Sequence, residues 1–334
     1  MRMRALLLRE QKPVEEGPLS FSELPIPEPG AGQILVRVLA CGVCHTDLHI
    51  AEGDLPLRKS PLVLGHQVVG EVVEVGPGVS RFEKGQRAGL FWLAWACGEC
   101  SFCRRGLENL CPKAQFTGYT VDGGFAQYTR ACADFAFPLP EDLSPEEEAP
   151  LLCAGIVGFR ALKLSGVQKG EILGLYGFGA SAHLVIQAAR FLGIRVFVFT
   201  RSPAHQNQAR ELGAEWVGSP KERPPEPLDA AIIFAPAGWI VPEALASTRP
   251  AGTVVLAGIH MTPIPEMTYR LLWEERVVRS VANATRADGE EFFKLAREAK
   301  IRPKVQVFPW EEANEVLLRL KRAEMQGAAV LRIS

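Results

Sequence analysis

The most restrictive feature of the chain is a run of four closely spaced cysteines, Cys97-x2-Cys100-x2-Cys103-x7-Cys111. Thiolates at these spacings can surround one tetrahedral ion, and a closed set of four thiolates is typical of a structural zinc site. An iron–sulfur cluster is the competing interpretation, because Pro112 follows the last cysteine as it does in ferredoxins. Ferredoxin runs leave about three residues before the last cysteine, whereas this run leaves seven, so structural zinc is the favoured prediction.

A second group of candidate metal ligands is spread along the chain and consists of Cys44, His66 and Cys153. Two thiolates and one imidazole leave the fourth position of a tetrahedral ion open, as in catalytic zinc sites. Taken alone, His66 would be interpreted as a structural histidine with satisfied hydrogen bonds. It becomes a candidate ligand only because the two thiols complete a set. Together the two groups predict two zinc ions per chain, one catalytic and one structural.

Cys44 belongs to the stretch 41–49, which combines thiols, imidazoles, a hydroxyl and a carboxylate. Cys41 and Cys44 by themselves are compatible with half a zinc ribbon or with a redox dithiol. No further Cys-x2-Cys pair remains to complete a ribbon once 97–111 is assigned, and the βαβ pattern of a thioredoxin-like site is missing around the pair. We therefore expect Cys41, and likewise Cys132, to be buried and unreactive.

Length and composition narrow the class of protein. With 334 residues, 47% hydrophobic and 22% charged, the chain suits two globular domains. The formal net charge is −1 and no basic run occurs, which argues against nucleic acid or an anionic membrane as a partner. No apolar run approaches the roughly 18 residues of a membrane span, and the apolar start at 1–10 is too short for a signal peptide. We expect a cytoplasmic protein, in which eight cysteines favour metal sites over disulfides.

Hydrophobic patterns divide the chain into two kinds of structure. Residues 1–140 are rich in strands and loops, with strands expected at 33–40 and 67–75. A proline-rich stretch at 137–150 is the candidate linker. Beyond it, strands and helices alternate, which predicts a parallel sheet wrapped by helices. The expected strands are 171–176, 196–199, 230–235, 253–257 and 277–281, and the expected helices are 180–192, 204–212, 290–300 and 311–323, before a closing strand at 327–333.

The strand at 171–176 leads into a glycine-rich turn of the form G-x-G-x-x-A. Gly177 suits a tight turn, Gly179 lets the pyrophosphate of a dinucleotide approach the helix N-terminus, and Ala182 permits close packing of helix on strand. Alone this motif is weak, because ordinary strand–helix turns resemble it. The second strand at 196–199 and the zinc motifs make a dinucleotide site the favoured interpretation.

The end of the strand at 196–199 indicates which dinucleotide is bound. Sites for NAD place Asp or Glu there to bind the ribose 2′-hydroxyl, whereas sites for NADP avoid the acid and supply Arg. Here Thr200 and Arg201 follow the strand and no acid is present. A guanidinium binds phosphate in bidentate fashion, so Arg201 suits a 2′-phosphate. NADP is the favoured cofactor, and NAD is the alternative, in which Arg201 points to solvent.

These motifs resemble those of the zinc-dependent alcohol dehydrogenases of the medium-chain dehydrogenase/reductase superfamily. The matching segments extend over nearly the whole chain and are 44–47, 65–66, 69–76, 97–112 and 153–155. The resemblance implies an α/β protein with a GroES-like, β-rich catalytic domain at 1–148 that holds both zinc sites. It also implies a Rossmann NAD(P)-binding domain with a doubly wound parallel sheet at 149–285, followed by a return to the first domain at 286–334. By the same analogy the protein is a homo-oligomer, either a tetramer or a dimer.

The resemblance assigns further roles within 41–49. His45 aligns with a contact to the cofactor pyrophosphate. Thr46 and His49 would carry the proton of the alcohol to solvent by way of a ribose hydroxyl. Asp47 would bond the back of His66 and fix its tautomer. Without the resemblance, Thr46 would be interpreted as a helix or turn cap and His49 as an exposed loop residue.

Three residues near the expected catalytic zinc bear on its chemistry and its substrate. Gln67 stands where relatives carry Glu directly after the metal-binding histidine, so we expect a slightly more electropositive site. Trp92 matches a pocket-lining position in relatives that act on small alcohols, with core packing as its alternative role. Leu55 replaces a bulkier residue of some relatives, which predicts a longer pocket.

The leading prediction is an oxidoreductase, a zinc-dependent alcohol dehydrogenase or aldehyde reductase. It would transfer hydride between NAD(P) and a small primary or aromatic alcohol or aldehyde. The open position of the zinc would supply a Lewis acid. The nearest alternative is a polyol, threonine or formaldehyde-type zinc dehydrogenase of the same superfamily. A remote alternative is a non-enzymatic zinc-binding interaction protein, which the balanced charge and the complete set Cys44, His66 and Cys153 disfavour.

Overall fold

The computed structural model describes residues 1–334 and divides into two compact units. The first unit comprises Met1–Cys153, Thr285–Glu290 and Pro303–Ser334. The second comprises Ala154–Ala284 and Glu291–Arg302. The proline-rich stretch expected to be a linker therefore lies wholly inside the first unit. None of the helices has the length and apolar character needed to cross a membrane.

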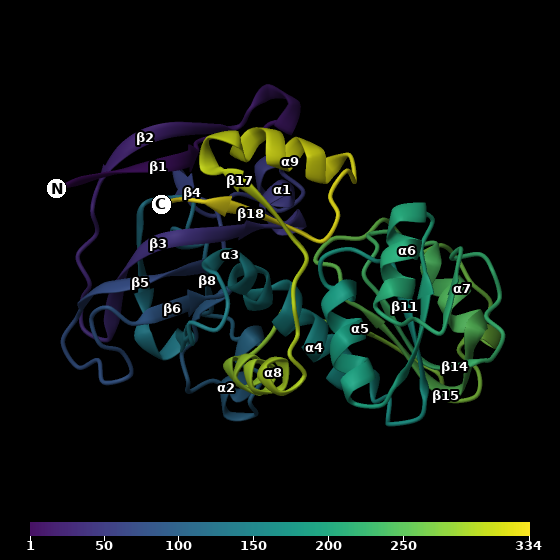
Figure 1. The fold of residues 1–334 in the computed structure, drawn as a ribbon. Helices are drawn as coiled ribbons and strands as arrows, with labels where there is room; N and C mark the ends of the chain where they lie inside the picture. Colours follow the sequence, from purple (N-terminus) through teal and green to yellow (C-terminus); the bar gives the residue numbers. More distant parts are fainter. The chain divides into compact units, whose positions relative to one another are not determined.

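The body of the first unit is a seven-stranded sheet. Its strands are β3 (Gln33–Val43), β5 (Gln67–Val75), β6 (Arg87–Leu90), β9 (Tyr128–Cys132), β10 (Ala136–Pro138), β17 (Val305–Pro309) and β18 (Ala328–Arg332). Six of them follow the order β10-β6-β5-β3-β18-β17, and β9 also pairs with β3 (Figure 1). Valine and isoleucine dominate the central strands, because branched side chains suit a pleated, buried surface. Val36, Val38 and Val68 are fully buried there.

The end of β3 lies between two strands that are far away in sequence. Gly42 pairs with Gln67 of β5 on one side and with Val330 of β18 on the other. In Figure 1 the C-terminal strand β18, in yellow, runs beside the purple β3. Cys44 directly follows β3 and His66 directly precedes β5. This register therefore brings two candidate ligands to the same end of the sheet.

Smaller elements complete the first unit. Strands β2 (Leu19–Pro25), β1 (Arg2–Leu8) and β4 (Leu62–Val63) form one small sheet, and β7 (Leu93–Trp95) pairs with β8 (Gln115–Phe116). Its α-helices are α1 (His45–Glu52), α2 (Ser101–Arg104), α3 (Pro145–Glu148) and α9 (Ala313–Lys321). Its 3-10 turns are η1 (Val14–Glu16), η2 (Glu108–Leu110), η3 (Ala133–Phe135), η4 (Ala149–Leu152) and η6 (Trp310–Glu312).

The second unit is built on a six-stranded, wholly parallel sheet. Its strands are β11 (Ile172–Tyr176), β12 (Arg195–Phe199), β13 (Trp216–Gly218), β14 (Leu228–Ile233), β15 (Thr248–Leu256) and β16 (Val277–Ser280). They lie in the order β13-β12-β11-β14-β15-β16. Counted along this unit, the order is 3-2-1-4-5-6, which is the doubly wound order of dinucleotide-binding folds.

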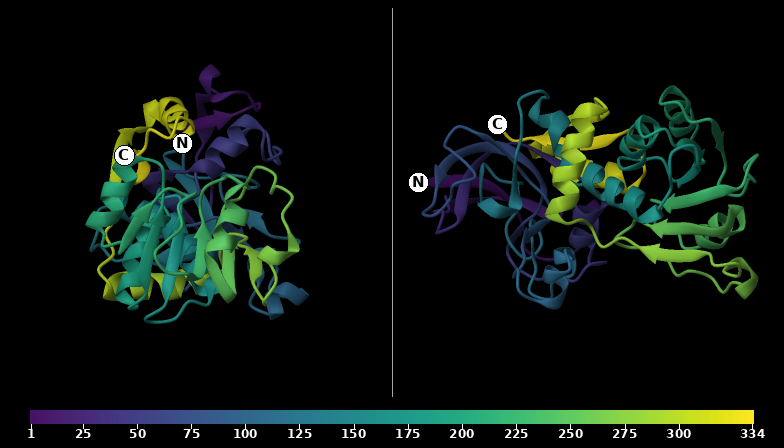
Figure 2. Two further views of the ribbon diagram at one scale, coloured as in Figure 1. Left: turned by 90° about the vertical axis from the view of Figure 1, so that its right-hand side faces the viewer. Right: turned by 90° about the horizontal axis from the view of Figure 1, so that it is seen from below.

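Helices lie on both sides of this parallel sheet (Figures 1 and 2). They are α4 (Ala154–Ser165), α5 (Ala182–Phe191), α6 (Pro203–Glu211) and α7 (Ile240–Ser247), with a short turn η5 (Tyr269–Leu271). Helix α8 (Arg286–Glu298) begins in the first unit and continues in the second. The α/β class and the Rossmann-type sheet are thus confirmed.

Most expected elements are present with shifted boundaries. Helix α8 begins four residues before the expected range 290–300, because Thr285 and Asp288 cap its start reciprocally. Asp288 accepts a hydrogen bond from the Thr285 backbone at 3.0 Å, and Thr285 Oγ1 accepts one from the Asp288 backbone at 3.2 Å. Periodicity did not predict α4 and α7, whose sequences are mostly apolar and whose residues are mostly buried.

Candidate metal centres and cofactor site

Cys44 begins helix α1 as its N-cap residue. Its thiol accepts a hydrogen bond from the Thr46 backbone at 3.4 Å, and its own backbone N–H donates to Asp47 Oδ2 at 3.0 Å. A cap of this kind satisfies backbone donors that the helix itself leaves free. The local sequence Cys-His-Thr-Asp therefore holds the Cys44 thiol at a defined point beyond the end of β3.

His66 is held by the turn that precedes β5. Gly65 has a φ of 93°, and a Cβ atom there would lie 2.5 Å from the Phe125 ring and 2.7 Å from Cys41 Sγ, so only glycine fits. Asp47 Oδ1 accepts the Gly65 N–H at 3.1 Å and lies 3.6 Å from His66 Nδ1. The latter distance is longer than a hydrogen bond. Asp47 thus ties together the backbone beside both ligands and stands behind the His66 ring.

Cys153 lies at the end of the 3-10 turn η4 and completes the group. The Sγ atoms of Cys44 and Cys153 and a ring nitrogen of His66 all lie within 4.8 Å of one another. Cys44 Sγ is 3.3 Å from His66 Nε2. The three residues come from a helix cap, a strand start and a turn, so only the folded sheet brings them together.

Electrostatics at this group suit a bound cation. The pKa of Cys44 is lowered well below its usual value, chiefly by the Cys153 thiol, which outweighs burial with further help from His66. Burial opposes charge on His66, yet the Cys44 thiolate and Asp47 raise its pKa to about 10. The site therefore stabilises thiolate together with positive charge, and its two sulfurs and one nitrogen are the donors that zinc takes in catalytic sites.

The four cysteines of the 97–111 loop also converge. Their Sγ atoms lie within 4.8 Å of one another. Cys97 Sγ is 3.5 Å from Cys111 Sγ and 4.0 Å from Cys103 Sγ. Two thiolates on one tetrahedral zinc would be roughly 3.8 Å apart, since each Zn–S bond is about 2.3 Å. This donor set fits a closed zinc site.

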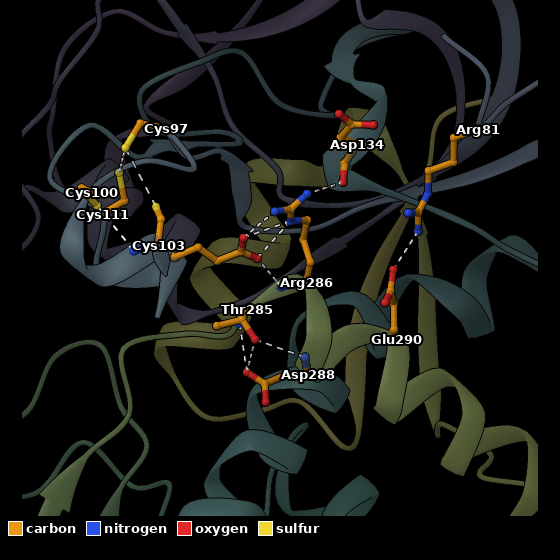
Figure 3. A network of polar contacts seen from close by, with 11 residues as sticks. Arg81, Cys97, Cys100, Cys103, Cys111, Asp134, Thr285, Arg286, Asp288 and Glu290 are labelled. Atoms are coloured by element: carbon orange, nitrogen blue, oxygen red, sulfur yellow. Dashed lines mark hydrogen bonds and ion pairs between the residues drawn. The ribbon is translucent and has the colours of Figure 1, made fainter. Parts of the chain in front are cut away.

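The four-cysteine loop is held to the start of helix α8 by an ion pair (Figure 3). Glu108 Oε1 accepts the Arg286 backbone N–H at 2.8 Å, and Glu108 Oε2 accepts from the guanidinium at 2.7 Å. The guanidinium also lies 4.1 Å from the Phe135 ring centroid and donates to the Asp134 carbonyl at 3.3 Å. Charge-assisted, bidentate pairs of this kind are among the stronger ones.

The residues expected to move a proton lie on α1. Thr46 is 9% exposed and His49 is 8% exposed. His49 Nδ1 lies 2.7 Å from Asp54 Oδ2, an acid that sequence reasoning did not single out. His45, at the first position of the helix, is exposed, and its ring centroid is 6.2 Å from that of His49.

An aromatic cluster lies beside His66. The Trp92 ring is edge-on to the His66 ring at 5.1 Å and stacks on Phe116 at 5.1 Å and on Tyr119 at 5.6 Å. Tyr119 also donates from its hydroxyl to the Pro56 carbonyl at 3.0 Å, which fixes the segment after Leu55. The sequence suggested Trp92 and Leu55 as pocket residues, and these remain predictions. Phe116 and Tyr119 carried no such signal, because their position depends on the β7–β8 pairing.

Gln67 is buried at 2% exposure next to His66. Its Nε2 has no hydrogen-bond partner within the protein. The side chain lies over Gly42, where a Cβ atom would be 2.7 Å from Gln67 Oε1. An unpaired buried amide is costly, so this N–H group points to a partner beyond the polypeptide.

The glycine-rich turn of the second unit has the expected form. Gly177 has a φ of 88°, and its N–H donates to the Phe199 carbonyl at 2.9 Å. A Cβ atom on Gly179 would meet nothing within 4 Å, so the backbone there is open to a ligand. Ala182 is fully buried at the start of α5. These features match a pyrophosphate site at a helix N-terminus.

Thr200 and Arg201 follow strand β12. Thr200 is 6% exposed, and its carbonyl accepts a hydrogen bond from Gln206 Nε2 at 2.9 Å. Arg201 is exposed, and Ser202 caps α6 by accepting from the His205 backbone at 3.4 Å. No acidic residue occurs between β12 and α6, which leaves a cationic and hydroxyl-bearing edge.

Comparisons with known proteins agree with this geometry. The family model described as the alcohol dehydrogenase GroES-like domain matches residues 30–141, and the zinc-binding dehydrogenase model matches residues 182–298. A probable alcohol dehydrogenase, AdhA, of Mycobacterium tuberculosis is 44% identical over 99% of this chain and 97% of its own. The chain belongs to the zinc-dependent alcohol dehydrogenase family. It is a zinc-type, NAD(P)-linked member of the medium-chain dehydrogenase/reductase superfamily.

Two further relatives of this alcohol dehydrogenase extend the comparison. An alcohol dehydrogenase of Geobacillus stearothermophilus is 38% identical over 95% of this chain and 96% of its own. Among solved structures, a cinnamyl alcohol dehydrogenase of Sorghum bicolor superposes with a TM-score of 0.90 at 27% identity, over 99% of this chain and 98% of its own.

Proposed function

We propose that this alcohol dehydrogenase interconverts small primary or aromatic alcohols and their aldehydes, with NADP(H) as the preferred dinucleotide. The observation that carries the substrate class is the cluster of Trp92, Phe116 and Tyr119 against His66. Flat aromatic walls favour planar or small substrates over branched polyols, which need several polar partners. The sorghum neighbour, named for cinnamyl alcohols, supports the same class.

In this proposal Cys44, His66 and Cys153 hold the catalytic zinc, and the four cysteines of 97–111 hold the structural one. When bound, the catalytic zinc supplies a Lewis acid for the oxygen of the substrate. Asp47 keeps the two ligand-bearing backbone segments together. Gln67 offers its unpaired N–H group to a ligand bound at the metal centre.

The proton of the alcohol leaves through the chain's own groups. The Thr46 hydroxyl would take up this proton and His49 would release it to solvent. The bound cofactor would supply a ribose hydroxyl. Asp54 holds the imidazole in position through Nδ1. Hydride transfer itself is the chemistry of the nicotinamide.

The cofactor residues belong to the second unit. Gly177, Gly179 and Ala182 form the pyrophosphate turn. Thr200 and Arg201 bind the 2′-phosphate of NADP. The lack of an acid after β12 supports this choice, because an acid there would repel that phosphate.

The proposed homo-oligomer has a suitable edge. Strand β16 ends the six-stranded sheet, and Val277 on it is 45% exposed. Tyr269 and Trp273, before it in sequence, are 70% and 59% exposed. Light scattering after size exclusion tests this point, and a monomeric mass would contradict it.

The substrate proposal is tested by aldehyde reduction with NADPH and NADH in parallel. Benzaldehyde, cinnamaldehyde and short aliphatic aldehydes are expected to give the highest kcat/KM in reduction. In the oxidative direction with NADP+ or NAD+, benzyl alcohol and short primary alcohols should be preferred, with sorbitol, threonine and the glutathione adduct of formaldehyde far behind. Trp92→Ala is expected to lower kcat/KM for aromatic aldehydes. Trp95→Ala is the matched control, because Trp95 has no ring contact with His66. A polyol or threonine preference would exclude the proposed class.

A further inference from the structure

We propose that Glu148 and Arg87 are positioning residues for Cys153. Their contact holds the turn η4 against strand β6, and the position of this turn determines where the Cys153 thiol lies. This inference rests on the proposed role of Cys153 as a ligand of the catalytic zinc. Glu148 and Arg87 act through η4, and their role is distinct from those of the three ligands.

The contact joins β6 to both ends of helix α3. Arg87 NH1 donates to Glu148 Oε2 at 3.2 Å and to the Leu143 carbonyl at 2.9 Å. Leu143 precedes the N-cap of α3, and Glu148 is its last residue. The Glu148 side chain is 3% exposed and that of Arg87 is 15% exposed. A buried hydrogen-bonded pair with little access to water holds its geometry more strictly than a surface pair does.

The turn η4 follows Glu148 directly and ends at Cys153. All four of its residues, 149–152, are buried, and Glu148 is the residue that caps it. Leu152 packs directly on the backbone of Gly89 in β6, because a Cβ atom on Gly89 would lie 2.7 Å from Leu152 Cδ2. Strand β6 therefore contacts this part of the chain at two points, through Arg87 and through Gly89.

Strand β6 also supports the second ligand. Leu90 of β6 pairs with Val68 of β5, two residues after His66. Strand β6 thus contacts the segments that carry His66 and Cys153, which come from distant parts of the sequence. A small displacement of η4 on β6 changes the distance between these ligands without unfolding the sheet. Outer contacts that orient metal ligands commonly affect metal affinity in this way.

The charge of Glu148 adds a pH dependence. Burial raises the pKa of Glu148 to about 7; Arg87 opposes this shift, while the acids Asp142 and Glu141 add to it. Ionisation is thus disfavoured in the buried position, so above about pH 7 the charged carboxylate favours arrangements in which it reaches water. Below that pH the neutral side chain keeps an oxygen that accepts from Arg87. The packing of η4 against β6 should therefore be most stable at low pH.

The test follows release of metal from the zinc-loaded enzyme. A chelator and iodoacetamide are added together, and alkylation of Cys44 and Cys153 is compared with that of the 97–111 cysteines by peptide mass spectrometry. Glu148→Ala should expose Cys44 and Cys153 about tenfold faster, with the 97–111 cysteines unchanged. Glu148→Gln keeps the accepting oxygen and should match the wild-type protein at pH 6 and be slower to release metal at pH 8. Glu146→Ala is the matched control, because Glu146 on the same helix pairs with Arg332 of β18 at 2.7 Å instead of with β6.

Wild-type labelling rates in Glu148→Ala would overturn the proposal, and so would equal acceleration at all the cysteines, which indicates general destabilisation. If Glu148→Ala does not fold, Gly89→Ala displaces Leu152 through a different contact. It should also accelerate labelling of Cys153, and a wild-type rate would again contradict the proposal. Failure of the metal site itself is recognised separately. Cys44 and Cys153 would then be labelled at once in the wild-type protein, with or without chelator.

Discussion

Asp54 Oδ2 lies 2.7 Å from His49 Nδ1, so a carboxylate holds the imidazole of the proposed proton path. The acid reaches this position because α1 ends at Gly53, whose φ of 95° reverses the chain after the helix. A partner on Nδ1 fixes which ring nitrogen carries the transferable proton. The pair thus links the helix C-cap to the proposed chemistry.

Asp54→Asn should lower kcat for alcohol oxidation about fivefold, since a charge-assisted hydrogen bond is replaced by a neutral one and about 1 kcal/mol is lost. The KM for the dinucleotide should change little. The solvent deuterium isotope effect on kcat should rise as proton transfer becomes more limiting. His49→Gln provides the limiting case, and an unchanged isotope effect in both variants would remove His49 from the path.

Gln67→Glu should strengthen metal retention about tenfold, because a carboxylate adds negative charge beside the cation that the site stabilises. The same charge should weaken the Lewis acid and lower kcat. Metal release to a chelator and steady-state kinetics measure the two effects. If kcat, KM and metal release all stay as in the wild-type enzyme, the electrostatic role of Gln67 is wrong.

Arg201→Ala should reduce kcat/KM for NADPH by roughly 10- to 100-fold, the value of one or two charge-assisted contacts to phosphate. Activity with NADH should be almost unaffected. Arg210→Ala is the matched control, because Arg210 is an arginine of α6 that bonds Asn207 at 3.2 Å. Equal losses with both dinucleotides, or a wild-type preference for NADH, would contradict the NADP proposal.

Cys103→Ser should remove about one zinc ion per chain and lower the midpoint of thermal unfolding, because a closed metal site contributes folding free energy. Glu108→Gln should keep both metals and lower the free energy of unfolding by about 1–3 kcal/mol, because its contacts to Arg286 are weakened. In the same loop, Glu99 pairs with Lys113 on the surface. Glu99→Gln should therefore lower the free energy of unfolding by at most about 1 kcal/mol. Metal analysis and calorimetry distinguish the three variants, and full zinc content in Cys103→Ser would refute the structural site.

The fold was largely predictable where hydrophobic periodicity is local. Strand β5 occupies the range expected from its branched residues, and the strand–helix alternation foretold the parallel sheet. Helix α4 escaped prediction because it is buried on most sides and lacks a polar stripe. The early start of α8 was readable in principle, since Thr285 and Asp288 have the spacing of a capping box.

The candidate site, like the fold, was predictable where it depends on local sequence and not where it depends on long-range contacts. Spacing identified the four cysteines of 97–111 and the glycine-rich turn, because each depends on a short stretch of backbone. Cys44, His66 and Cys153 were grouped by donor type, since they are far apart in the sequence. The partners Asp54, Tyr119 and Glu148 had no such signal. Glu148 meets Arg87 across 61 residues, and no local pattern records that contact.

The sequence by itself determined which chemistry the chain can perform: two sets of zinc donors, a dinucleotide turn and the lack of an acid after β12. Those features are properties of side-chain type and short spacing. Only the tertiary structure decided which groups meet. The pairing of Gly42 with Gln67 brings Cys44 to His66. The packing of η4 against β6 brings Cys153 to the same two residues. Strand register and the burial of a turn are long-range outcomes of packing, because they are chosen by the free energy of the whole sheet.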